Sequence, residues 1–186
     1  VEEIVGMYDV AAVNPSPAFF DRKKLLHVNG EWVRRLPLDD FLVRADPFLP
    51  NDEARAALRA LGPLVQERVK LLSEVPGMVR YLFDGPAAYA ADDLVPKKLD
   101  RTRTAEMLAS LEPFIRLACD GDPGIEEKVR ALAESKGVKL GDLLMPLRVA
   151  ITGSKVSPPL FESIRLVGAE RALASSTAAI EKLRGT

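Results

Sequence analysis

The sequence has 186 residues, of which 47% are hydrophobic, and it carries 26 Lys and Arg against 27 Asp and Glu. This composition predicts one or two globular domains with buried cores, and it excludes binding of nucleic acid through bulk positive charge. The single cysteine, Cys119, and the single histidine, His27, exclude a disulfide within the chain and are too few for a Cys/His zinc site. We therefore expect no metal site, and we interpret His27 as a packed or half-exposed residue of a helix.

The first half of the chain shows hydrophobic residues at helical spacing, with proline and glycine between the helical stretches. The expected segments are the end of a helix in 1–10, a turn in 14–20, a short helix in 21–29 ending at Asn29-Gly30, another in 36–45 ending before Pro47, and a long helical stretch in 50–77 that is capped by Asn51 or Asp52 and interrupted at Gly62-Pro63.

The second half continues this helical pattern, and no segment shows the alternation of a strand. The expected segments are a strong helix within 96–122, a helix over 122–137 with Asp122 as its cap, Pro123 in its first position and Gly137 at its end, a helical run over 139–153 with a kink or a helix start at Pro146, and two C-terminal helices that are split at Gly168. The predicted fold is all-α, an irregular helical cage of about ten mostly short helices.

Charge and proline content suggest where the chain divides. Residues 1–95 have a charge balance of −4 and residues 96–186 a balance of +3, so we place a boundary at 94–98. The proline-containing segment "DPFLPND" suggests a second boundary at 46–50. The predicted parts are therefore 1–46, 47–96 and 97–186.

Two arginines occur where hydrophobic residues are expected. With "LVQERVKLLSE" placed on a helix, Arg68 falls in the middle of the apolar face, and Arg148 is the only charged residue in "LLMPLRVAI". Because burying an unpartnered guanidinium costs several kcal/mol, each must be paired or must face a groove. A buried pair with Asp142, Glu162 or Glu67 is one interpretation. A cation that faces a flat ligand is the other, since guanidinium is planar and stacks on rings.

The segment "TGSKVSPPL" separates the run around Arg148 from the next helix. Gly153 can adopt a positive φ and end the first helix, and Ser157 is the expected N-cap of the second. The prolines that follow Ser157 fix the backbone at the helix start. Such a rigid start with a hydroxyl group suits a flat polar ligand, although an ordinary loop between helices would show the same pattern.

Three stretches together resemble the C-terminal half of a bacterial-type glutamyl-tRNA synthetase, which is a class I aminoacyl-tRNA synthetase. "FFDRKKLLHVNGEWV" is similar to the family's Phe-Asp-x-x-Lys-Leu-x-x-x-Asn-x-x-Tyr stretch, with Trp32 in place of the tyrosine. "ERVKLLSEVPGMVRYLF" resembles the helix that carries an anticodon-reading arginine. "KGVKLGDLLMPLRVAITGSKVSPPLFESIRLVGAERAL" resembles the family's most recognisable C-terminal block.

This resemblance implies an all-helical anticodon-binding region that is preceded by the end of a stem-contact segment. It assigns Arg68 to the third anticodon base, where arginine is associated with enzymes that accept only glutamate tRNA. It assigns Arg148 to the middle base, and it assigns Ser157, Pro158 and Leu160 to the pocket for the first base. Phosphate contacts would come from Lys97, Lys98, Arg101 and Arg103, although "PKKLDRTR" could equally be a solvated helix entrance.

The family's ATP-binding signatures are missing from this sequence. The resemblance therefore implies that the segment itself has no catalytic residue and no cofactor, and that ATP and Mg²⁺ belong to the parent ligase. The expected partners are the anticodon loop of glutamate tRNA and the N-terminal catalytic half of the same parent chain, in the cytoplasm, with no membrane and no DNA. The alternative is a helical protein-interaction module that derives from such an enzyme and no longer reads RNA.

Overall fold

The structure is a computed structural model that describes residues 2–7, 9, 11 and 19–185. All regular elements within these residues are helical, so the predicted all-α fold is confirmed. The α-helices are α1 (Glu2–Met7), α2 (Arg22–Arg35), α3 (Leu38–Ala45), α4 (Asp52–Gln66), α5 (Val75–Val79), α6 (Ala91–Leu94), α7 (Arg101–Cys119), α8 (Ile125–Ser135), α9 (Leu140–Thr152), α10 (Leu160–Val167) and α11 (Ala169–Arg184). Short 3₁₀ helices are η2 (Asp46–Phe48), η3 (Leu72–Glu74) and η4 (Arg80–Leu82). The turn predicted in 14–20 lies mostly outside the described residues.

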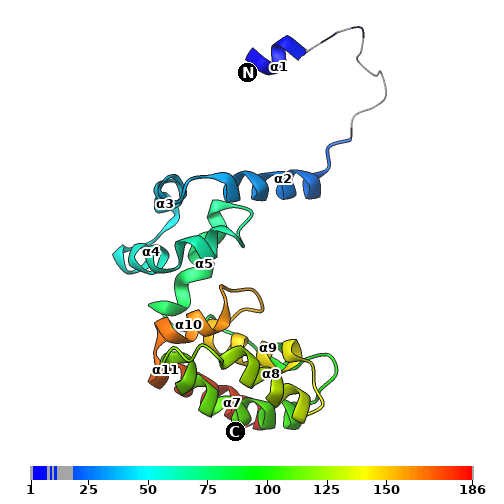
Figure 1. The fold of residues 1–186 in the computed structure, drawn as a ribbon, viewed down its shortest axis with the longest axis vertical. Helices are drawn as coiled ribbons and strands as arrows, with labels where there is room; N and C mark the ends of the chain where they lie inside the picture. Colours follow the sequence, from blue (N-terminus) through cyan, green and yellow to red (C-terminus); the bar gives the residue numbers. More distant parts are fainter. Residues whose placement is uncertain (1, 8, 10, 12–18, 186) are drawn as a thin grey trace.

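The helices from α2 onward form two groups, which Figure 1 shows stacked along the long axis of the molecule. The first group is α2 to α5, and the second is α6 to α11, in which α7 and α11 pack against each other. Between the groups lies η4, which contacts α4 and α5 on one side and α9 and α10 on the other. The predicted division into 1–46, 47–96 and 97–186 stays a prediction. Helix α6 belongs to the second group because it contacts α7, α9 and α11.

The prediction that a short helix ends at Asn29-Gly30 is wrong, because α2 continues to Arg35. Gly30 is buried, and a Cβ atom added there would lie 3.2 Å from the Cγ of Lys70. The side-chain amide of Asn29 donates a hydrogen bond to the Lys70 carbonyl. This Asn-Gly pair therefore permits a close approach of two segments and does not break the helix.

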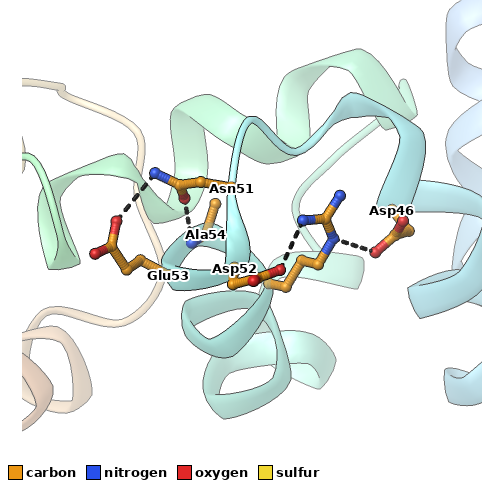
Figure 2. A network of polar contacts seen from close by, with 6 residues as sticks. Asp46, Asn51, Asp52, Glu53 and Ala54 are labelled. Carbon is orange, nitrogen blue, oxygen red and sulfur yellow. Dashed lines mark hydrogen bonds and ion pairs between the residues drawn. The ribbon is translucent and has the colours of Figure 1, made fainter.

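Polar contacts fix the start of α4, as Figure 2 shows. Asn51 is the N-cap, one of the two residues predicted for that position, and its Oδ1 accepts a hydrogen bond of 2.9 Å from the Ala54 amide. Arg55 donates to Asp46 in η2 at 2.7 Å and to Asp52 at 3.0 Å. The predicted boundary at 46–50 is thus a short connection that is tied to the helix following it.

The interruption predicted at Gly62-Pro63 does not occur, and α4 ends at Gln66. Gly62 is buried, and a Cβ atom there would lie 3.1 Å from a methyl group of Leu38, so this glycine lets α3 approach α4. Pro63 is on the exposed side of the helix. The buried Gln66 side chain donates to the carbonyls of Val33 and Leu36, both at 2.8 Å, and thereby joins the end of α4 to the end of α2.

The second group follows the sequence prediction more closely. Gly137 and Gly168 have φ values of +67° and +86° and lie at helix ends, as predicted. The predicted cap of α8 is wrong by two residues, because Gly124 is the N-cap and the Asp122 carboxylate instead accepts a hydrogen bond from the Gly124 amide. Pro146 lies inside α9, which continues through it. None of the described helices is long and apolar enough to cross a membrane.

Candidate nucleic-acid interface

Arg148 is half-buried on α9 and is held by neutral oxygen atoms. Its Nη1 donates to the hydroxyl of Ser157 and, at 2.9 Å, to the carbonyl of Pro158. Burial lowers the pKa of Arg148, and the positive charge of Arg68 lowers it further. Within the part of the chain that the structure describes, Arg148 has no carboxylate partner, so the pairing with Asp142 or Glu162 that the sequence left open is not observed.

The Ser157 hydroxyl binds Arg148 and does not cap the following helix. The prediction that Ser157 is the N-cap of α10 is wrong, because Pro159 occupies that position. An N-cap hydroxyl normally accepts from an amide two or three residues further on, but Pro158 and Pro159 leave few amides within its reach. The Ser157 hydroxyl accepts from Arg148 and donates to the Pro158 carbonyl at 2.9 Å, which fixes the guanidinium and the loop together.

Gly153 sets the path of this loop. It has a φ of +72° at the end of α9, which confirms the positive φ that the sequence indicated. A Cβ atom there would lie 2.3 Å from the backbone nitrogen of Ala87, so only glycine permits this approach. The Thr152 hydroxyl donates to the Arg148 carbonyl at 2.8 Å. The loop after α9 is therefore held against the backbone of Ala87.

Arg68 is half-buried, as Arg148 is, and it lies on a turn. The helix on which its apolar-face position was predicted has ended at Gln66, so that prediction is wrong. The Arg68 guanidinium donates to the Leu64 carbonyl at 3.0 Å and forms a long ion pair of 3.9 Å with Glu67, whose side chain is 71% exposed. The side chain of Arg68 itself is 32% exposed.

The two arginines are close enough for the charge of Arg68 to lower the pKa of Arg148. They come from different groups of helices, Arg68 from the turn after α4 and Arg148 from α9. Bringing like charges together is unfavourable for folding, and such arrangements concentrate at functional sites, where a ligand compensates for the repulsion. The pair therefore marks the best candidate for a binding site.

Tyr81 is linked to this candidate site by hydrogen bonds, although sequence reasoning did not single it out. It lies on η4, is 2% exposed, and its hydroxyl donates to the Ser163 hydroxyl at 2.7 Å. Ser163 in turn donates to the Pro159 carbonyl at 2.9 Å. Burial raises the pKa of Tyr81, while the Ser163 hydrogen bond and the charge of Arg148 act in the opposite direction. The one sequence signal was a tyrosine within the apolar run "MVRYLF", which is typical of an ordinary core residue.

The other candidate residues differ in how accessible they are. Leu160 is 3% exposed and lies in the hydrophobic core beneath the loop, so its side chain does not reach the surface. Lys97 and Lys98 are exposed. Arg101 is paired with Asp92 at 2.6 Å and Arg103 with Glu106 at 2.9 Å. The structure thus brings together Arg68, Arg148, Ser157 and Pro158, with Tyr81 behind them.

The structure therefore combines an all-helical fold with two neighbouring guanidinium groups beside a rigid loop. Comparison with known proteins gives the family: the chain belongs to the anticodon binding domain family, which matches residues 40–179. The resemblance seen in the sequence is thereby confirmed.

Curated relatives support the same assignment. The chain is 32% identical to the glutamate–tRNA ligase of Treponema denticola, over 93% of this chain and 40% of that protein. It is 38% identical to that of Leifsonia xyli, over 94% of this chain and 38% of that protein. The chain therefore spans about two-fifths of the length of these relatives. A crystal structure of a glutamate tRNA ligase from Elizabethkingia meningosepticum, 22% identical, has the same fold with a TM-score of 0.61, over 98% of this chain and 36% of that one.

Proposed function

We propose that this chain reads the anticodon of glutamate tRNA as part of a glutamate–tRNA ligase, which joins L-glutamate to that tRNA with ATP. One observation carries the proposal: the half-buried guanidinium of Arg148 is fixed by Ser157 and Pro158 and lacks a carboxylate partner among the described residues. The membership in an anticodon-binding family and the ligase relatives support it.

The proposed mechanism is the reading of unpaired bases. Proteins that recognise RNA sequence usually bind bases splayed from a loop, through stacking and through hydrogen bonds to the base edges. Arg148 would bind the middle anticodon base, and Arg68 would bind the third. Each correct contact is worth roughly 1–3 kcal/mol, so a few contacts give discrimination without a large basic surface.

The first anticodon base would lie against the rigid loop at Ser157 and Pro158. Both side chains are buried in the free chain, so the exposed edge of this loop would supply the contact. Leu160 would support the loop from the core rather than touch the base. Tyr81 and Ser163 would hold the loop in place behind the site.

ATP and Mg²⁺ belong to this proposal only at the level of the whole ligase. We assign neither group to residues of this chain. The cytoplasm, where tRNA is charged, is the setting that we propose for this function, and the catalytic part of the same ligase is the proposed partner.

The test is a binding titration with transcripts of glutamate tRNA that carry the native anticodon or single changes in it. Wild type should bind the native transcript more tightly, by about tenfold or more for a change in the third base. Arg68→Gln should remove the preference at that base and leave the others. Arg59→Gln, the same substitution at an exposed residue of α4, is the matched control and should change neither affinity nor preference.

Equal binding of every transcript by wild type would overturn the proposal and favour the protein-interaction module. Loss of the folded state in Arg68→Gln, measured by circular dichroism, would instead make Arg68 a structural residue. These two outcomes are separate, because the first concerns wild type and the second the variant.

A further inference from the structure

A pocket of about 400 Å³ has four lysines in its lining. Its lining includes Lys97, Lys98, Lys139 and Lys155, together with Asp142 and Met145. The lysines come from three separate segments: the link between α6 and α7, the residue before α9, and the loop after α9. The fold therefore gathers cations that the sequence keeps apart, and Lys139 and Lys155 carry no signal when the sequence is considered alone.

The charges in this pocket are only partly balanced. Lys155 pairs with Asp93 at 3.3 Å, and Asp142 is the acidic residue of the lining. Lys97, Lys98 and Lys139 are exposed, and the described contacts give them no ion pair. Arg101 and Arg103 differ, because each is already paired with a carboxylate of the chain.

The pocket shares helix α9 with Arg148. Met145, which lines the pocket, lies three residues before Arg148, so the two side chains are neighbours on the surface of the helix. Lys155 comes two residues before Ser157, in the loop that holds the guanidinium. A base at Arg148 and a backbone group in the pocket could therefore belong to neighbouring nucleotides.

We propose that this pocket binds a backbone phosphate of the RNA, and that Lys139 and Lys155 act in it with Lys97 and Lys98. The inference rests on the proposed function. Lysine binds phosphate as a compact point charge, and the exposed lysines without an ion pair keep that charge for a ligand. Phosphate contacts position an RNA and base contacts specify it, so the lysine pocket would set the register in which the arginines read.

The experiment compares wild type with the double variant Lys139→Gln/Lys155→Gln in tRNA titrations at several salt concentrations. The variant should bind every transcript less tightly by about the same factor, and its preference for the native anticodon should be unchanged. The slope of log affinity against log salt should become shallower by roughly 0.7, which corresponds to one phosphate contact on a single strand. Arg116→Gln/Arg130→Gln, with the same loss of charge on α7 and α8, should keep the wild-type slope.

An unchanged salt slope and affinity in a folded double variant would overturn the inference, while a wild-type preference for the native anticodon would still support the proposed function. Competition with inorganic phosphate distinguishes the source of the ligand. If millimolar phosphate binds wild type and not the variant, and tRNA affinity is the same in both, the pocket is a free-anion site and the RNA assignment is wrong. If wild type binds all transcripts equally, the proposed function fails whatever the slope.

Discussion

The two arginines of the site are held in opposite ways. Arg148 is fixed on a helix by hydrogen bonds to Ser157 and Pro158, and the surrounding loop is itself held by Gly153. Arg68 lies on a turn, where its contacts are with the carbonyl of Leu64 and, at long range, with the exposed Glu67. Preorganised groups lose less entropy when they bind a ligand. We therefore expect Arg148 to keep its position on binding and Arg68 to adjust its side chain to the ligand.

This difference shows that the surroundings of a charge decide its role. In the sequence, Arg68 and Arg148 are both lone cations near apolar residues, and the same two interpretations applied to both. In the structure, replacing Arg148 should disturb the loop that carries Ser157 and Pro158, and replacing Arg68 should leave that loop unchanged. The variants below separate the two regions, beginning with the largest expected effect.

Gly153→Ala should disturb the region of Arg148 most strongly. The new Cβ would lie within 2.6 Å of three backbone atoms of Ala87, and the residue would keep a φ of +72°. We expect a loss of about 3 kcal/mol or more in the free energy of unfolding, measured with urea, because overpacking and backbone strain add. Gly137→Ala is the control: its φ is +67°, but no atom lies within 4 Å of the new Cβ. It should lose roughly 1–2 kcal/mol. Equal losses would show that the contact with Ala87 does not hold the loop.

Arg148→Gln and Arg68→Gln should differ in stability as well as in binding. The first removes the donor to Ser157 and Pro158, and it should lower the free energy of unfolding by about 1–2 kcal/mol. The second removes a side chain from a turn and should change stability by less than about 0.5 kcal/mol. Urea denaturation of both variants checks this prediction. Equal stabilities would mean that the hydrogen bonds of Arg148 do not distinguish its region from that of Arg68.

The sequence predicted the helical architecture and the family well, because hydrophobic spacing, proline and glycine are local signals. It predicted the positive φ of Gly153 for the same reason. It failed where a distant segment decided the outcome: at Asn29-Gly30 a helix approaches the segment of Lys70, and at Gly62-Pro63 it approaches another helix, so neither pair is a break. The role of Ser157 was misjudged because its partner, Arg148, lies nine residues away on another helix. Tyr81 has the sequence pattern of a core residue. Its hydrogen bond to Ser163 spans 82 residues, so no local signal could reveal it.

Tyr81→Phe tests the connection between the two regions. The ring stays in place, and the hydrogen bond from η4 to Ser163 is lost. We expect a decrease of about 1 kcal/mol in the free energy of unfolding, together with a weaker preference for the native anticodon at more than one base. Tyr89→Phe is the control, because Tyr89 is a partly buried tyrosine whose described contacts are with Lys182 and not with the site. A preference that is unchanged in Tyr81→Phe would show that the two regions read their bases independently.

Glu67→Gln should have the smallest effect on stability and binding, and it tests whether Glu67 holds Arg68 in place. The ion pair is 3.9 Å long and its carboxylate is 71% exposed, and such surface pairs contribute between about 0 and 1 kcal/mol. We therefore expect no measurable change in unfolding, and a slight gain in tRNA affinity at low salt because a negative charge beside the RNA is removed. Titration at two salt concentrations checks the gain, which should disappear at the higher one. If Glu67→Gln instead destabilises the fold and abolishes the third-base preference, Arg68 is held in place by Glu67. In that case the adaptable arginine of this comparison is as fixed as Arg148.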